Sequence, residues 1–501
     1  MIQYSFQRIG GLDLRILILA GVALLACALP TEAQLTLRRA AEEALATNHG
    51  IRAVESTLRA RSAGVAAARG YLFPQITIDA AYTRMNEALE LNLDPIREAM
   101  ISLEVGNQGA LSNLESLVSQ GRPLTAAEQA VVSSQAAQQL DDMLPQFRET
   151  LKDQGFLQGI VTARQPLFTG GKILAGIRAA QAQQTAAAAA LDAERDAVLA
   201  ETAQRYLDVL LAAENLRVRE EAKRTLTLHQ GRATRLMEEG VIAQHEKMRA
   251  DVALADADRA AFDARERLQI AKVALNSAIG ADNPQLAVSD SLRFAEAPVT
   301  LEHALESMQR GNPSLRQLRA GTVALEQKAR AKRADYFPTV YGFGMYNVFD
   351  KYMAEGLEPK WAVGIGASFT LFDGLNRTRE LEAARLEASA LESRTAEAER
   401  KLSLFLQSAN MQMELAEEQY RQLTAALNQA EENLRLNSRR FDEGLGTSLE
   451  VIDARLSLDA VLLQRVLALH TYFSRQVDLF HVVGNVDLFL NHWERTQERD
   501  G

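Results

Sequence analysis

The chain contains an internal duplication, and this feature limits its possible folds more than any other. Residues 36–86 align with residues 300–350 at a constant offset of 264, which places Phe73-Pro74 on Phe337-Pro338. Farther along, the offset is 204, and Gly240 aligns with Gly444. The two offsets hold without gaps and differ by 60 residues, so the first copy carries an insertion of that length between about residues 87 and 156.

Each copy has the same order: a helical segment, two strands and a long helical hairpin. The strands are expected at about residues 74–86 and 157–168 in the first copy and 338–349 and 361–372 in the second. In the last of these, apolar residues from Trp361 onward alternate with small or polar ones, a pattern typical of a membrane barrel strand. The strands at 157–168 and 338–349 alternate less cleanly and are assigned chiefly from the repeat.

The hairpins begin with helical patterns that contain no proline, at about 172–238 and 375–442. A helix of roughly 65 residues is about 100 Å long, far beyond the globular average. In the second copy a coiled-coil seam is predicted from apolar 4-3 spacing at Leu402, Leu406, Ala409, Met413, Ala416, Tyr420, Leu423, Leu427, Ala430, Leu434, Asn437 and Phe441. Antiparallel helices return to Gly280 and Gly484, so the hairpins are expected at 172–280 and 375–484.

The N-terminus has the pattern of a secretory signal. Arg8 and Arg15 precede the apolar run 16–29, which is too short to span a bilayer, and a small-residue cleavage site ends at Ala33. Residues 1–33 are therefore expected to be a signal peptide. Cys27 has two interpretations: a lipidated N-terminus after different processing, or an apolar residue of the discarded signal.

Composition excludes several classes of function. The net charge is −10, which argues against a general nucleic-acid binder. Cys27 is the only cysteine, so one chain cannot build a disulfide framework or a cysteine-based zinc site. The seven histidines lack HExxH spacing, and the sequence contains neither a G-x-S-x-G motif nor a P-loop. We expect no enzyme activity, no cofactor and no metal site.

Four amphipathic strands cannot close a barrel, and an open sheet edge is not tolerated in lipid. Other copies of the chain must supply the missing strands. A dimer would give eight strands and an interior filled by side chains, whereas a trimer would give twelve strands and room for a lumen. We therefore expect a homotrimer.

The order of elements resembles the TolC family of trimeric outer-membrane channels, over residues 35 to about 486. The motifs that carry the resemblance are the duplicated Phe-Pro step, the strand exits at 167–171 and 371–374, and the hairpin tip 440–445. The resemblance implies a mixed α and membrane-β fold, with a trimeric twelve-stranded β-barrel in the outer membrane continued by an α-helical barrel across the periplasm. It further implies the exit duct of a tripartite efflux pump or type I secretion system, with a periplasmic adaptor and an inner-membrane transporter as partners.

Glu450 and Asp453 are candidates for a periplasmic gate. They are three residues apart, so both carboxylates are expected on one face of the returning helix, and the matching positions in the family carry acidic residues at the periplasmic mouth. In a trimer, six carboxylates would favour cations. The alternative is a solvated first helical turn favoured by the helix dipole.

The hairpin tips are the second candidate site. The resemblance implies docking of the adaptor at Arg235, Gly240, Val241, Arg439, Arg440, Gly444 and Leu445. Turn chemistry is the alternative, and it is sufficient to explain the glycines.

The expected organisation is repeat 1 at 34–298, repeat 2 at 299–486 and a C-terminal tail at 487–501. The insertion at about 90–152 has a helical, polar sequence and is expected either to cap the extracellular mouth or to form a disordered surface loop. A soluble periplasmic coiled-coil adaptor or scaffold is the alternative function. The one-sided apolar strand that begins at Trp361 favours the channel.

Overall fold

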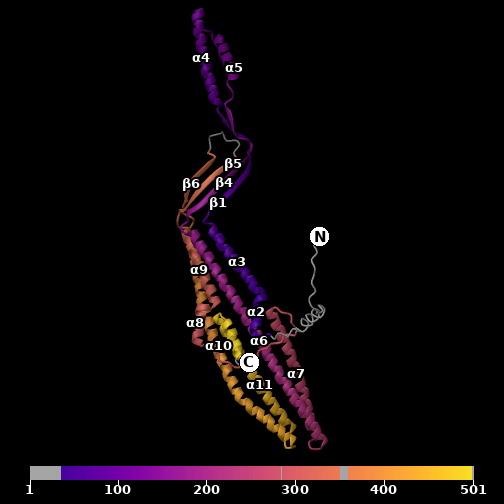
Figure 1. Ribbon diagram of the computed structural model, residues 1–501. Coiled ribbons are helices and arrows are strands. Elements are labelled where there is room, and N and C mark those ends of the chain that lie inside the picture. The colour runs from indigo at the N-terminus through magenta and orange to yellow at the C-terminus, as the bar shows by residue number, and fades with distance from the viewer. Residues whose placement is uncertain (1–34, 284, 350–358, 499–501) are drawn as a thin grey trace, which may run out of the picture. The chain divides into compact units, whose positions relative to one another are not determined.

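The computed structural model describes residues 35–283, 285–349 and 359–498 (Figure 1). The expected signal peptide and Cys27 lie outside these residues. The described chain forms two compact units. The helical unit comprises residues 35–65, 178–329 and 382–498, and the sheet unit comprises residues 66–177 and 330–381.

The core of the sheet unit is a four-stranded antiparallel sheet in the order β1-β4-β5-β6. The strands are β1 (Gln75–Arg84), β4 (Gly155–Phe168), β5 (Thr339–Phe349) and β6 (Trp361–Ser368). The predicted end of β6 at residue 372 is wrong. Ser368 pairs with Thr339, the first residue of β5, so the ladder within the chain ends there.

Glycines in β6 make room for aromatic rings of β5. A Cβ atom at Gly364 would lie 2.8 Å from Cζ of Phe343, and one at Gly366 would lie 2.6 Å from Cζ of Tyr341. The guanidinium of Arg164 on β4 stacks over the Tyr341 ring, 3.8 Å from its centroid. These contacts fix the rings on one face of the sheet.

The insertion is a helical hairpin on a β-ribbon. Strands β2 (Leu89–Asn92) and β3 (Arg148–Lys152) pair antiparallel and lead into helices α4 (Asp94–Gln120) and α5 (Ala126–Met143). Thr125 and Glu128 form a capping box at the start of α5. The helical pattern predicted for the insertion is therefore present, whereas the β-ribbon was not predicted.

The two long hairpins belong largely to the helical unit. The first consists of α6 (Lys172–Glu238) and α7 (Gln244–Ile279), and the second of α10 (Asn376–Asp442) and α11 (Ser448–Val483). Every residue of the seam predicted along α10 is buried or half-buried. Gly280 and Gly484 end the returning helices with positive φ angles of 68° and 84°, as expected for C-caps.

Shorter helices complete both copies. They are α2 (Leu37–Thr47) and α3 (His49–Gly70) in the first copy, and α8 (Leu301–Gly311) and α9 (Pro313–Ala334) in the second. Thr36 and Thr300, which the offset of 264 aligns, cap α2 and α8 through their hydroxyl groups. The duplication is thus visible in individual hydrogen bonds.

The predicted C-terminal tail is instead a packed helix, α12 (Asp487–Glu498). Phe489, Leu490 and Trp493 are buried in the core of the helical unit. The indole N–H of Trp493 donates to the carboxylate of Asp290 over 2.8 Å, and its ring meets Phe473 edge-on. No helix in the described parts of the chain is long and apolar enough to cross a membrane.

Candidate functional site

One face of the sheet is apolar and exposed. The register places Ile78, Val161, Tyr346 and Trp361 in one row across the four strands. Ile365 on this face is 75% accessible, and the face also includes Ile76, Ile78, Tyr82, Leu157, Trp361 and Val363. Soluble monomers rarely expose a contiguous apolar surface of this kind, so the face indicates an interface with lipid or protein.

Among the described residues both edges of this sheet are open, because β1 and β6 each have only one neighbouring strand. Each edge therefore presents backbone N–H and C=O groups to another strand. The face opposite the apolar row is mixed, with Thr77, Thr162 and Arg164 among its residues. The sheet thus has the alternation of a barrel wall, with one apolar and one partly polar side.

The two hairpin tips have the same backbone geometry. At the first tip the N–H of Val241 donates to Leu236 O over 2.8 Å, and the N–H of Gly240 donates to Met237 O over 3.0 Å. At the second tip the N–H groups of Leu445 and Gly444 make the equivalent bonds to Arg440 O and Phe441 O. Both are Schellman motifs, and their glycines have φ angles of 76° and 71°.

All seven residues proposed to dock an adaptor are exposed: Arg235, Gly240, Val241, Arg439, Arg440, Gly444 and Leu445. Val241 is 54% accessible and Leu445 is 70% accessible. The side chain of Arg440 folds back over its own turn, donates to Leu445 O over 3.3 Å and lies 3.9 Å from Glu450. Arg235 and Arg439 lie on the last turns of α6 and α10.

The structure gives the two gate candidates different environments. The Glu450 carboxylate accepts from the backbone N–H of Thr447 over 3.0 Å, and the Thr447 hydroxyl accepts from the N–H of Glu450. This capping box holds the half-buried Glu450 side chain at the start of α11. Asp453 is exposed one turn later. The alternative interpretation, a first helical turn, therefore describes Glu450 better than Asp453.

Glu246 makes a contact between the two hairpins that the sequence analysis did not predict. Its carboxylate accepts from the backbone N–H of Ser448, the first residue of α11, over 2.9 Å. The repeat offset of 204 aligns Glu246 with Glu450, but the first copy has Ala243 where the second has the capping Thr447. Glu246 therefore caps the other hairpin instead of its own. The replacement of Thr by Ala was the sequence signal that could have revealed this.

His229 is buried beside this contact. Its Nε2 lies 2.7 Å from the Ser448 hydroxyl, and its ring packs against Phe441 at 4.6 Å between centroids. Burial lowers the pKa of His229 to about 4; Arg232 acts in the same direction, while Asp442 and Glu246 oppose it.

An ion pair and an apolar cluster complete the contact between the hairpins. Arg232 on α6 and Asp442 on α10 are 3.0 Å apart. The buried apolar side chains here are those of Ala233, Ala250, Phe441 and Val451. Near their tips, the two hairpins are thus held by one ion pair, two hydrogen bonds and a small core.

Comparison with known proteins identifies the family. The chain matches the family model of outer membrane efflux proteins over residues 125–281 and 304–485, one segment in each copy of the repeat. The chain belongs to this family. Membership makes it an efflux channel protein of the outer membrane, with a helical part in the periplasm, and not an enzyme.

Solved structures of outer-membrane proteins share the fold. VceC of Vibrio cholerae is 16% identical with a TM-score of 0.67, and the match covers 90% of this chain and 96% of that one. The CmeC channel of Campylobacter jejuni is 13% identical with a TM-score of 0.66, covering 91% and 89%. The MtrE channel of Neisseria gonorrhoeae is 16% identical with a TM-score of 0.66, covering 90% and 89%. No curated protein sequence matches the chain.

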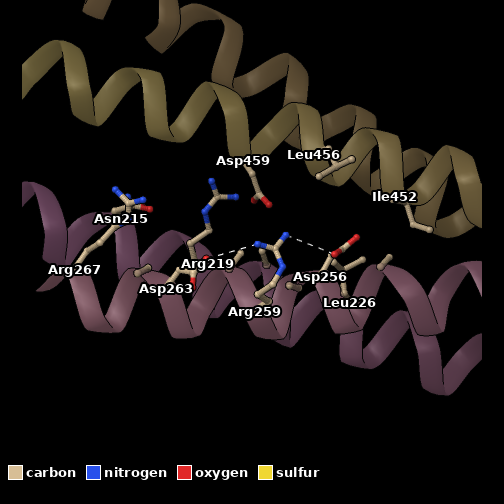
Figure 2. Close-up of a pocket in the computed structure, with 15 residues that line it drawn as sticks. Asn215, Arg219, Leu226, Asp256, Arg259, Asp263, Arg267, Ile452, Leu456 and Asp459 are labelled. Carbon is tan, nitrogen blue, oxygen red and sulfur yellow. Dashed lines mark ion pairs between the residues drawn. The ribbon is translucent and has the colours of Figure 1, made fainter.

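A groove of about 510 Å³ lies between α6, α7 and α11 of this efflux protein (Figure 2). On α7, Arg259 lies between Asp256 and Asp263, at 3.7 and 3.6 Å. Arg219 on α6 points toward Asp459 on α11. Positive and negative side chains therefore face each other inside the groove. Its lining does not form a surface of one charge that would attract a ligand of the opposite charge. Across the described residues, no group of three His, Cys, Asp or Glu side chains is placed to hold a metal ion.

Proposed function

We propose that this outer-membrane efflux channel works as a homotrimer and forms the exit duct of a tripartite efflux pump. The observation that carries the trimer is the four-stranded sheet with two open edges and one exposed apolar face. Three copies supply twelve strands, which close the edges, turn the apolar row toward lipid and leave a lumen. The soluble scaffold is not retained, because the family is an outer-membrane one.

The assembly can be tested in isolated outer membranes. Detergent extracts should contain a heat-sensitive oligomer of three subunits, measured by light scattering after the detergent contribution is subtracted. A freely soluble single subunit would refute the proposal. A dimer would refute the twelve-stranded barrel but leave the membrane location intact.

The hairpin tips dock a periplasmic adaptor, which links the duct to an energised inner-membrane transporter. Support comes from the two identical turns and from the exposure of Val241 and Leu445 beside exposed arginines. Gly444→Asp places a side chain at a φ of 71°, where a Cβ atom would also lie 3.2 Å from Val241. We expect this variant to assemble but to lose export, measured as cellular accumulation of a fluorescent efflux substrate. Gly171→Asp, at the other end of α6 with a similar φ of 87°, is the control for backbone strain.

If Gly444→Asp exports as well as the unchanged channel, the tip does not dock the adaptor. If deletion of the whole chain leaves dye accumulation unchanged but abolishes release of a secreted protein, the channel serves type I secretion. Efflux is preferred because it is the activity that names the family.

Asp453 and Glu450 ring the periplasmic gate and favour cations. Because Glu450 is held in its capping box and Asp453 is exposed, Asp453 supplies the larger part of the field at the opening. In planar bilayers, Asp453→Asn should therefore reduce cation selectivity more than Glu450→Gln does. Equal selectivity in both variants and the unchanged channel would refute the gate assignment.

A further inference from the structure

The two helices of the insertion have different outer faces. Toward α5, helix α4 presents mostly small and polar side chains, and Ile101 and Val105 are the half-buried apolar residues that line the groove between the two helices. A Cβ atom at Gly109 would lie 3.8 Å from the Ser133 hydroxyl, and Ser116 is buried and donates to Arg122 O. Asn113 accepts from the backbone N–H of Leu124 over 2.8 Å. The side of α4 that faces away from α5 is apolar and exposed.

This exposed face of α4 has a heptad pattern. Its members follow strict 4-3 spacing: Ile96, Met100, Leu103, Asn107, Ala110, Leu114 and Leu117. All seven are exposed, with Leu103 at 69% and Leu114 at 60%, and Leu111 and Val118 widen the stripe. In heptad notation Met100, Asn107 and Leu114 occupy a positions, so one a position holds the polar Asn that fixes register in coiled coils.

The exposed side of α5 is different. Gln129, Gln135, Gln139 and Asp142 are exposed there, and the exposed large apolar residues of α5 are Val131 and, at the end of the helix, Met143. A hairpin in water would be expected to bury apolar side chains between its helices and to leave both outer faces polar. This hairpin has only a few half-buried apolar residues between its helices, and it also keeps an apolar seam of more than three heptads on the outside of one helix.

The insertion is continuous with the edge of the sheet where another copy must join. The ladder between β1 and β4 runs to Arg84 and Gly155, and the N–H of Met85 donates to Gln154 O before the β2–β3 ribbon begins. β1 is an edge strand of the sheet. In a closed ring this edge meets the next copy, and α4 follows directly from the β2 strand of the same ribbon.

We propose that the exposed α4 seam is covered by the α4 helices of the other copies, so that the three insertions form a parallel coiled coil. This inference rests on the proposed trimer. Copies related by rotation about one axis place their α4 helices parallel and in register, so the Asn107 side chains at the one polar a position meet at the same level of the coiled coil. The polar face of α5 then lies on the outside of the coiled coil.

Cross-linking of the full-length channel in outer membranes tests the proposal. Leu103→Cys lies in the seam, and Gln135→Cys on the exposed face of α5 is the matched control; both also carry Cys27→Ser. A short bis-maleimide joins two thiols without an oxidant. We expect most Leu103→Cys chains to become covalent dimers, because one linker joins two of the three chains in each trimer. We expect the Gln135→Cys chains to remain single subunits without a cross-link.

Leu114→Cys places a thiol at a second seam position, so the test does not depend on correct folding around residue 103 alone. If both seam variants remain single subunits while the heat-sensitive trimer is present, the seam does not join copies and the inference is refuted, although the trimer stands. If no trimer is present in the unchanged channel, the proposed function itself fails. Cross-linking of either seam variant to a different protein, without covalent dimers, also refutes the inference.

Discussion

Acidification should loosen the contact between the hairpins near their tips, and His229 should be the group responsible. The ring is buried and hydrogen-bonded to Ser448, and burial lowers its pKa to about 4. When the contact opens, His229 is solvated and its pKa returns to about 6.5. The open state then binds a proton more readily than the closed state, so the closed contact has its full stability above pH 6.5 and loses stability as the pH falls from 6.5 toward 4.

The size of the effect follows from these two values. Between pH 7 and pH 5 the closed contact should lose about 2 kcal/mol, which corresponds to an increase of about 20-fold in its opening equilibrium. The backbone N–H of Ser448 reports this opening directly, because it is bonded to Glu246 only while the hairpins are in contact.

Hydrogen exchange of the peptide that contains Ser448 measures the opening, after correction for the intrinsic pH dependence of exchange. His229→Gln is the control, because its amide can bond the Ser448 hydroxyl but does not titrate. Arg232, Asp442 and Glu246 face His229 and are unchanged in this variant. Protection should therefore fall on acidification in the unchanged channel and stay constant in His229→Gln. An equal loss in both proteins would assign the effect to the carboxylates and refute the role of His229.

Two further predictions concern packing. Arg455 and Asp459 on α11 form a buried ion pair at 2.6 Å, with 3% and 6% of their side chains accessible. Arg455→Met leaves the Asp459 carboxylate buried without its partner and should destabilise the helical unit by about 3–5 kcal/mol, measured by urea unfolding followed by circular dichroism. Adding Asp459→Leu to the same chain should recover most of that loss. In the sheet, Gly366→Val should displace the Tyr341 ring and lower the yield of heat-sensitive oligomer on gels. Gly342→Ala should not lower this yield, because the nearest atom to a Cβ at that position would be 3.9 Å away.

The repeated architecture could be predicted because its signals are periodic. The seam along α10 extends over many turns, so an error at one position changes little, and the glycines at 240 and 444 end their helices through a positive φ that the sequence marks directly. Strand ends were less certain. Whether β6 continues beyond Ser368 depends on where β5 begins, and no local pattern in β6 contains that information.

The contacts between the hairpins could not be predicted in this way. His229 and Ser448 are 219 residues apart, and Glu246 and Ser448 are 202 apart, so neither pair shares a local pattern. The helix α12 was missed although a signal was present. Phe489, Leu490 and Trp493 lie at helical spacing, but a twelve-residue helix at a chain end has too few turns for periodicity alone to distinguish it from a tail.

The duplicated hairpins differ where the structure brings them together. In the second copy, Thr447 engages Glu450 in a capping box, and Asp453 remains the exposed carboxylate. In the first copy, Ala243 offers no such cap, and Glu246 reaches across to the start of α11. The difference between Ala243 and Thr447 at the two helix N-termini therefore gives two equivalent glutamates different roles. Glu450 caps its own helix, and Glu246 makes a contact between the hairpins. Restoring the symmetry with Ala243→Thr should draw Glu246 back to its own helix and weaken the contact between the tips, because one carboxylate cannot cap both helices in the same way.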